Sequence, residues 1–320
     1  MYVLYVLIPM IQCREECSKR WEEKWSRKYP GRSWGIDSNC LKTKRRKIAY
    51  HGREEWIHMK SGKGIEIGAC DMPIQFEHLE MDYLDKSKED VVLCFGSKNK
   101  RVTIVDDAST LGSIPSNSYD LVVAAHVLEH QDNVIQTLLA WLRVSRSLVY
   151  FIVPDICEMR SGDQYRLITK PTHFFEEFFQ NNSKQNYQQH LQEAAIGAAY
   201  FNFSGHALPF AIDGCLDAQP KLLDNIVQNN LARYPLAAHL HTFTFFSLHQ
   251  LLHRLQQFSP TFDILRIDIV QGDNIFLHDE IRVLLRKKFL FHHHSSAKLR
   301  DFFLKKTQHL HTVERKTPRS

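Results

Sequence analysis

This 320-residue sequence has little that points to a membrane or to secretion. Met1–Gln12 is apolar, but it is shorter than the roughly 20 residues that span a bilayer. It also lacks the basic start and small-residue cleavage site of a signal peptide. We expect a cytoplasmic protein, with residues 1–12 forming a strand or preceding the natural start.

Paired cysteines are missing as well. The seven cysteines are odd in number, and none has C-x-x-C spacing. They are Cys13, Cys17, Cys40, Cys70, Cys94, Cys157 and Cys215. Cys13 and Cys17 stand four apart with no matching His/Cys pair nearby. This pattern argues against a disulfide framework and a cysteine-based zinc site, and it favours a reduced compartment.

The basic excess is confined to the end of the chain. The formal net charge is +5, but residues 286–320 hold ten Lys/Arg and two acids, a net +8. The other 285 residues then carry 31 bases and 34 acids, a net −3. We therefore expect no nucleic-acid partner for the folded body. Residues 287–320 are predicted to be a flexible basic tail, either solvated or drawn to an anionic membrane surface.

Five short apolar runs separated by polar segments indicate a parallel sheet. The predicted strands are 64–67, 78–84, 101–105, 121–125 and 148–153. A helix with apolar residues from Val127 to Leu142 lies between the fourth and fifth runs. Residues 243–258 predict another helix, and 262–270 and 280–285 predict a hairpin around Gly272-Asp273-Asn274.

Composition divides the chain into five parts. We expect a leader packed on the core at 1–60, a cofactor-binding core at 61–155 and a helical insertion or lid on the acceptor side at 156–240. Residues 241–286 complete the core, and the basic tail follows.

The first loop is a poor phosphate cradle. In Gly64–Pro73, Cys70 and Pro73 replace the second and third glycines of G-x-G-x-x-G. A dinucleotide is therefore disfavoured, and a cofactor without phosphate, such as S-adenosylmethionine, fits better. Acids suited to its ammonium, ribose and adenine groups occur near three successive strand ends, at Glu66, Asp82 and Asp107.

The segment Ser118–His130, with Asp-apolar strand-HVLEH, resembles the fourth-strand motif of class I S-adenosylmethionine-dependent methyltransferases. The first motif, EIGA with Pro73, is similar to a type 11-like subgroup associated with glycan and lipopolysaccharide synthesis. The resemblance implies an α/β fold: a doubly wound Rossmann-like methyltransferase sheet with a final antiparallel hairpin and a helical insertion. The cofactor-binding residues that it implies are Glu66, Gly68, Ala69, Asp82, Asp107, Ala125 and His126.

The resemblance also implies methyl transfer to an acceptor hydroxyl, of a sugar or glycan, with a glycosyltransferase as a candidate partner. The alternative is a catalytically degenerate fold that supports a glycan-assembly enzyme. His239 and His241 alternate, so both point to one side of an extended segment, and either one is a candidate catalytic base. Asp163 and Arg166 form either an acceptor contact or a surface pair.

His126, Glu129 and His130 also match H-x-x-E-H, whose members share a helical face. A metal at these three residues is one interpretation, and local hydrogen bonding is another. A zinc hydrolase is the remote alternative, because such a motif needs a long helix and this one directly follows a strand. Of the 18 histidines, the four candidates for a functional role are His126, His130, His239 and His241.

Overall fold

A computed structural model describes residues 52–69, 73–87, 102–156, 163, 166, 168–180, 186–194, 238–271 and 279–288. Several features of the sequence lie outside these residues. They are the seven cysteines, the leader before residue 52, the Gly272-Asp273-Asn274 turn and the tail after residue 288.

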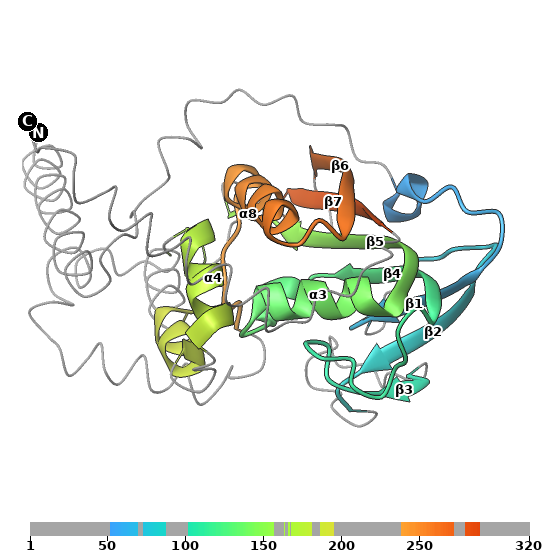
Figure 1. Cartoon of the computed structure of the whole chain (residues 1–320), viewed down its shortest axis with the longest axis horizontal. Helices are drawn as coiled ribbons and strands as arrows, with labels where there is room; N and C mark the ends of the chain where they lie inside the picture. Colours follow the sequence, from blue (N-terminus) through green and yellow to red (C-terminus); the bar gives the residue numbers. More distant parts are fainter. Residues whose placement is uncertain are drawn as a thin grey trace, which may run out of the picture.

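Seven strands form one mixed sheet in the order β3-β2-β1-β4-β5-β7-β6 (Figure 1). The strands are β1 (Lys63–Ile67), β2 (Glu80–Asp85), β3 (Ile104–Val105), β4 (Tyr119–Ala125), β5 (Ser145–Pro154), β6 (Phe262–Val270) and β7 (Glu280–Lys287). The first five are parallel, and β7 pairs antiparallel with both β5 and β6. The predicted fold class, an α/β sheet of parallel strands that ends in an antiparallel strand pair, is therefore confirmed.

The central strands form because their residues are apolar on both faces. In β1 only Lys63 is not buried, and residues 121–124 of β4 and 149–154 of β5 are buried. Such continuous burial is typical of parallel strands covered on both sides. The strand β6 has exposed and half-buried residues in its middle, as expected at a sheet edge.

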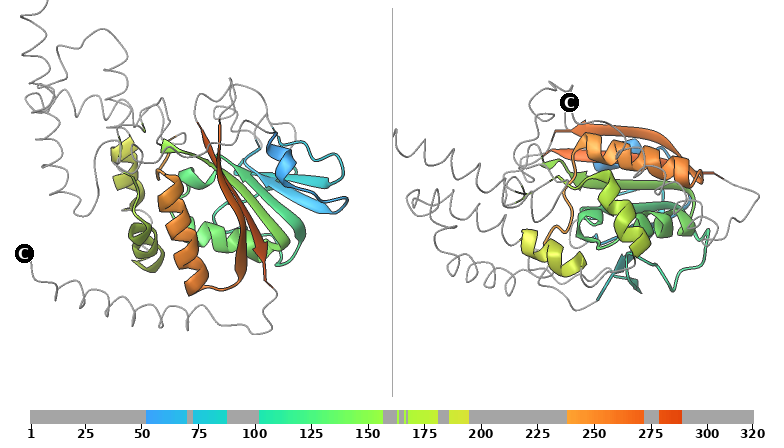
Figure 2. Two further views of the ribbon diagram at one scale, coloured as in Figure 1. Left: turned by 90° about the horizontal axis from the view of Figure 1, so that it is seen from above. Right: turned by 60° about the vertical axis from the view of Figure 1, so that its left-hand side comes forward.

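Three helices cover one face of the sheet (Figure 2): α3 (Val134–Val144), α4 (Pro171–Gln180) and α8 (Phe245–Phe258). The side chain of Asn133 accepts the Gln136 amide and starts α3. Thr244 and Ser247 form a capping box that starts α8. The helix α4 packs against α3 and α8, so the residues that follow β5 return to the same face.

The other face carries the short 3₁₀ helix η1 (Arg53–Trp56) (Figure 2). Trp56 is 5% exposed, and its ring lies 5.9 Å from that of Tyr150 on β5. The guanidinium of Arg266 on β6 lies 4.0 Å from the centre of the Trp56 ring. The short helix thus bridges the middle and the edge of the sheet.

One helix starts later than the sequence predicts. The helix expected from Val127 begins at Val134, and a 3₁₀ turn, η3 (Leu128–His130), precedes it. Within the predicted insertion, α4 and residues 186–194 are helical. None of the helices in the described part of the chain is long and apolar enough to cross a membrane.

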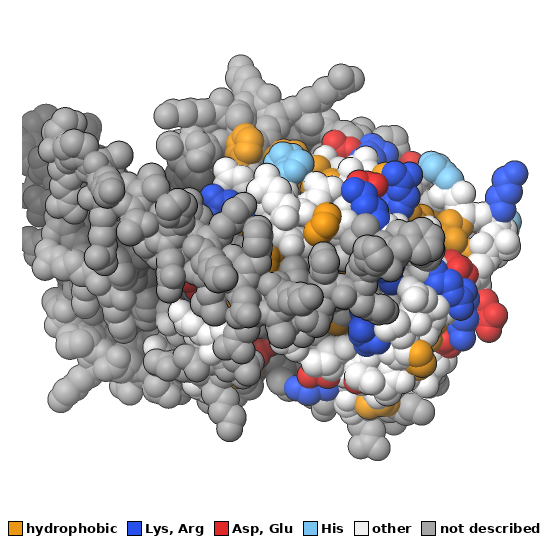
Figure 3. Space-filling model, in the orientation of Figure 1, with side chains coloured by type: hydrophobic (Ala, Val, Ile, Leu, Met, Phe, Trp, Pro, Cys, Tyr) orange, Lys and Arg blue, Asp and Glu red, His pale blue; other side chains and the backbone are white. Residues whose placement is uncertain are grey.

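The surface of the described residues mixes charges of both signs. Figure 3 shows one face of the molecule, on which basic and acidic side chains lie side by side. Several are paired, among them Asp120 with Arg146 and Arg266 with Asp268. Exposed pairs of this kind contribute little to stability.

Candidate functional site

The five parallel strands have their carboxyl ends along the same edge of the sheet, the carboxyl-terminal edge. Open α/β sheets bind ligands at this edge. Gly68 follows β1 at this edge with a φ of +66°, and its amide donates to the carbonyl of Leu84 at 2.8 Å. A Cβ at this position would lie 2.7 Å from Cγ2 of Val127. Only glycine fits both the backbone conformation and this close approach. Ala69 comes directly after the turn.

Glu66 anchors the chain beyond that turn. Its carboxylate is 1% exposed and accepts the amide of Ile74 at 3.1 and 3.2 Å. The predicted cofactor acid therefore holds the returning loop against the end of β1.

The prediction that Asp82 lies near the carboxyl end of β2 is wrong. Asp82 is the third of six residues, and its carboxylate lies 3.0 Å from the Lys63 ammonium and accepts from the Tyr119 hydroxyl at 2.8 Å. Lys63 and Tyr119 begin β1 and β4, so Asp82 faces the amino end of the sheet. The residue that ends β2 is Asp85, one residue beyond the predicted strand 78–84.

Asp107 lies beyond the carboxyl end of β3, as expected. Its Oδ1 accepts from the backbone amide and the hydroxyl of Ser109, at 2.7 and 2.6 Å. Asp106 makes the same two contacts with Ser113, at 2.8 and 2.6 Å. These turns hold the Asp107 side chain at the same edge of the sheet as Gly68.

Ala125 ends β4, and His126 follows with a φ of +56°, which is uncommon for a residue other than glycine. The His126 amide donates to Ile152 on β5 at 2.9 Å. Its imidazole Nδ1 lies 3.4 Å from Glu129, and Nε2 lies 3.2 Å from Glu280. His126 thus combines a strained backbone with a charged side chain that is 20% exposed. This combination is typical of a functional position.

Burial opposes charge on His126, but its hydrogen bonds to the carboxylates of Glu129 and Glu280 outweigh burial and raise its pKa to about 9. Burial likewise opposes ionisation of Glu129, but His126 and the neighbouring histidines lower its pKa to about 2. Burial, together with the charge of His239, lowers the pKa of His130 to about 4. At neutral pH the edge therefore carries a protonated His126, an ionised Glu129 and a neutral His130.

Glu280 joins several charged groups where β7 meets the end of β5. No pattern in the sequence marks this residue. It begins β7, opposite Pro154 of β5, and accepts from Arg53 at 2.5 Å and from Arg282 at 3.0 Å. Arg282 is fully buried and also donates to the Gly52 carbonyl. No local spacing joins residues 53, 126 and 280, so only the fold reveals this group.

The raised pKa of His126 predicts a pH-dependent stability. A histidine whose folded-state pKa exceeds the unfolded value stabilises the fold fully below about pH 6.5, and this contribution is lost as pH rises through the folded value. We expect the free energy of unfolding to fall by about 2–3 kcal/mol between pH 6.5 and 9. Urea unfolding at a series of pH values measures this. His126→Gln should flatten the decline, His253→Gln on the surface of α8 should not, and equal slopes in all three proteins would contradict the assignment.

His239 lies beside Glu129 and pairs with Asp163. Its Nδ1 is 2.6 Å from Asp163 Oδ2, and its Nε2 is 4.0 Å from Glu129 Oε1. Burial lowers the pKa of His239, but the charge of Asp163 outweighs this and raises it. The imidazole is 21% exposed, so it keeps access to a ligand at this edge.

Arg166 is not a surface residue, so the predicted surface pair with Asp163 is wrong. Its side chain is 3% exposed, and it donates to Asp163 at 2.7 Å, to the carbonyl of His239 and to the carbonyl of Leu240 at 3.0 Å. Arg166 therefore fastens the segment that carries His239, and Asp163 orients the imidazole.

The prediction that His239 and His241 point to one side is wrong. The His241 side chain is fully buried, with Nε2 3.5 Å from Glu177 on α4. Two-residue spacing aligns side chains only in a regular strand. Here the chain bends, because the amides of Leu240 and His241 both donate to the carbonyl of Glu129. His241 therefore does not face the edge where His239 lies.

The predicted H-x-x-E-H helix face is absent, since η3 has only three residues and His126 precedes it in a left-handed conformation. The structure instead groups Glu129 and His130 with His239, whose ligand atoms lie within 4.8 Å of one another. A zinc-hydrolase helix is not formed by these residues.

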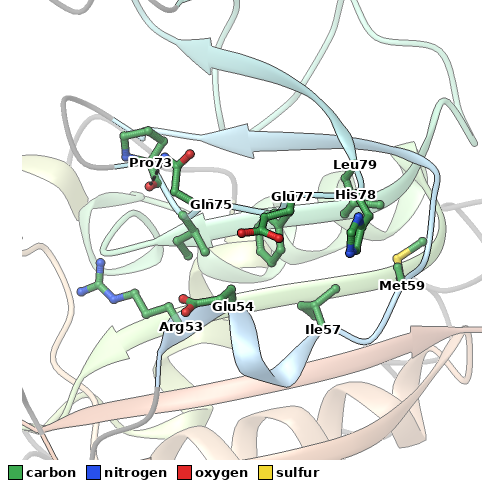
Figure 4. Close-up of a pocket in the computed structure, with 11 residues that line it drawn as sticks. Arg53, Glu54, Ile57, Met59, Pro73, Gln75, Glu77, His78 and Leu79 are labelled. Carbon is green, nitrogen blue, oxygen red and sulfur yellow. Dashed lines mark hydrogen bonds between the residues drawn. The ribbon is translucent and has the colours of Figure 1, made fainter.

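A pocket of about 450 Å³ opens next to this edge, between η1 and residues 73–79 (Figure 4). Arg53 and Glu54 lie on one side of it, and Pro73 and Gln75 lie across from them. Its wall includes Ile74, the residue that Glu66 holds. The pocket therefore adjoins the Gly68 turn without including the predicted cofactor residues in its lining.

Residues 62–153, from β1 to the end of β5, match a family model described as a methyltransferase domain. No curated protein matches the chain. Among solved structures, the chain is similar to a S-adenosylmethionine-dependent methyltransferase from Methanosarcina mazei (13% identity, 76% of this chain and 100% of that chain, TM-score 0.40). Another, from Aquifex aeolicus, shows 9% identity over 72% of this chain and 85% of that chain, with a TM-score of 0.37. A third is magnesium protoporphyrin IX methyltransferase from Synechocystis with bound SAH (11% identity, 71% and 75%, TM-score 0.34).

Proposed function

We propose that this protein is a S-adenosylmethionine-dependent methyltransferase that transfers a methyl group to an acceptor hydroxyl. One observation carries the proposal: the residues that match a methyltransferase domain are the five parallel strands whose carboxyl ends bear the candidate site. When bound, the cofactor supplies an electrophilic sulfonium methyl group.

The residues at the edge fit such a cofactor. Gly68 gives the close turn after β1 that a nucleoside needs, and no phosphate-binding glycines are required. Asp85 ends β2 and takes the ribose-binding role that the sequence analysis gave to Asp82. Asp107 and Ala125 follow at the ends of β3 and β4, where the adenine would lie.

Two histidines suit the acceptor side. Asp163 holds Nδ1 of His239 and leaves Nε2 to accept the proton of the acceptor hydroxyl, as in other His–carboxylate pairs. His126 is protonated at neutral pH, and its two ring nitrogens face Glu129 and Glu280, so it fixes these charged groups beside the acceptor rather than removing a proton. The chain's main contribution is then to position the two reactants.

The acceptor class is inferred from the resemblance to the glycan-associated subgroup. Several polar groups surround His239, where the acceptor would bind. We propose a sugar or glycan hydroxyl in the cytoplasm, with a glycosyltransferase as partner, and contact of the basic tail with a membrane.

Calorimetric titration of the full chain with S-adenosylmethionine tests the proposal. We expect the wild type to bind, and Gly68→Ala to bind about tenfold more weakly or worse, because the left-handed conformation costs about 1–2 kcal/mol with a side chain. The Cβ would also press on Val127. Gly112→Ala is the matched control, since its Cβ would meet nothing nearer than 3.8 Å.

Absence of binding at millimolar cofactor would contradict the proposal and favour a non-catalytic partner protein. Equal affinity in wild type and Gly68→Ala would place the cofactor elsewhere. An acceptor screen with a labelled methyl donor then identifies the hydroxyl that is methylated.

A further inference from the structure

A second cluster of histidines lies among the helices that cover one face of the sheet, and it is joined to the proposed active-site edge by the hydrogen bond from the His241 amide to the Glu129 carbonyl. It contains His173 and Glu177 of α4, His190 and His241. His173 and Glu177 are one helical turn apart, so they share a face of α4. His190 lies in the helical residues 186–194, and His241 lies just before α8. Three separate segments therefore converge on one point.

The ligand atoms of the cluster face one another. Nε2 of His173 and Nε2 of His190 lie 2.8 and 2.5 Å from Oε1 of Glu177, and Nε2 of His241 lies 3.5 Å from Oε2. The Nε2 atoms of His173 and His190 are 3.4 Å apart. All four ligand atoms lie within 4.8 Å of one another.

These separations are close to those of a tetrahedral metal site. Tetrahedral ligands at 2.0–2.2 Å from zinc lie about 3.3–3.6 Å from one another. The separation between His173 and His190 already has this value, and so does that between His241 and Glu177. The two contacts to Oε1 are shorter and need to widen by under about 1 Å for metal binding.

Hydrogen bonding alone serves this arrangement poorly. If His173 and His190 both donate to the same oxygen of Glu177, their N–H protons come close together, because the two nitrogens are 3.4 Å apart. A cation between the four groups interacts favourably with every lone pair. Three imidazoles and one carboxylate are also a donor set that suits zinc and similar divalent metals.

Three of the four residues are buried, and aromatic rings pack beside them. The exposed fractions of His190, His241 and Glu177 are 1%, 1% and 3%. The Phe174 ring lies 5.0 Å from that of His241 and stacks on Phe243 at 5.5 Å. His173 is 20% exposed, but four protein ligands fill a tetrahedral site, and such a site is of the structural kind.

We propose that His173, Glu177, His190 and His241 bind one structural divalent transition metal ion, with zinc favoured by the donor set. The ion fastens α4 and residues 186–194 to the segment that leads into α8. That segment also carries His239, so the metal stabilises the region beside the proposed active site. The metal site itself does not depend on the proposed methyl transfer.

Metal analysis of the purified full chain tests the proposal. We expect about one zinc per chain after dialysis, and a chelator that strips it should lower the melting temperature by at least about 4 °C. Zinc should restore that temperature, and cobalt should give the visible absorption of a tetrahedral site. A chain without retained zinc, and with no stabilisation by added zinc or cobalt, would overturn the proposal.

Variants locate the ion. His190→Ala should weaken zinc binding by more than about 100-fold, beyond the effect of an outer-shell change. His253→Ala is the matched control, because His249 and His253 form a similar pair 3.1 Å apart on the surface of α8. Loss of zinc in His130→Ala with full retention in His190→Ala would move the ion to Glu129 and His239 and so refute the assignment.

A conservative variant guards against misfolding of His190→Ala. His190→Cys keeps a ligand, so the cobalt form should stay loaded and gain a sulfur-to-metal charge-transfer band that the wild type lacks. A folded His190→Cys protein that binds cobalt without this band would exclude position 190 from the metal site.

Discussion

Glu280→Ala is expected to lower the free energy of unfolding by about 3–5 kcal/mol, because it leaves buried cations without their counter-charge. The Glu280 carboxylate is 3% exposed and contacts Arg53, Arg282 and His126. These cations hold its pKa well below the ordinary value even though burial opposes ionisation. Urea unfolding at pH 7 measures the loss.

Two further variants separate charge from packing. Glu280→Gln keeps the shape and should lose most of the same stability if the charge is responsible. Asp268→Asn removes an exposed ion pair with Arg266 on the adjacent strand β6 and should change stability by less than about 1 kcal/mol. A small effect of Glu280→Gln alongside a large effect of Glu280→Ala would show that volume rather than charge matters.

His239→Asn is expected to lower kcat for methyl transfer by about 10²–10⁴-fold, the usual contribution of a general base. This prediction rests on the proposed function, with the acceptor found in the screen. Affinity for S-adenosylmethionine should stay within about twofold, since the residues assigned to the cofactor come from the ends of the strands. Steady-state kinetics together with calorimetry separate the two effects.

Asp163→Asn should lower kcat in the same direction, because Asp163 holds the imidazole through a 2.6 Å contact. His249→Asn on α8 is the control, and its kcat should match the wild type. If His239→Asn weakens cofactor binding and leaves kcat unchanged, then His239 is a binding residue and the base lies elsewhere.

Much of the sheet follows from local patterns. The apolar runs predicted β1, β4 and β5 to within a few residues, because a strand buried on both faces needs consecutive apolar side chains. The turn after β1 also followed, since Gly68 lies where a parallel strand must end. The edge acids were harder to place. Asp82 and Asp85 both lie in β2, three residues apart. Which of them reaches the carboxyl end depends on where the strand ends.

The histidines show the limit of pattern reasoning more clearly. His239 and His241 have the spacing of neighbours on one strand face. The chain bends between them, where two amides donate to the Glu129 carbonyl, so their side chains lie in different clusters. The H-x-x-x-E spacing of His173 and Glu177 was available in the sequence. It gained meaning only when the fold brought His190 and His241 to the same point.

The sequence by itself determined the order of the elements, the glycine turn and the absence of a dinucleotide loop, because each depends on residues close together in the chain. Only the tertiary structure decided which charged groups meet. Arg53 and His126 reach Glu280 across more than 150 positions, and His173 reaches His241 across 68. Such contacts depend on the pairing and bending of whole strands and helices, and no local spacing records them.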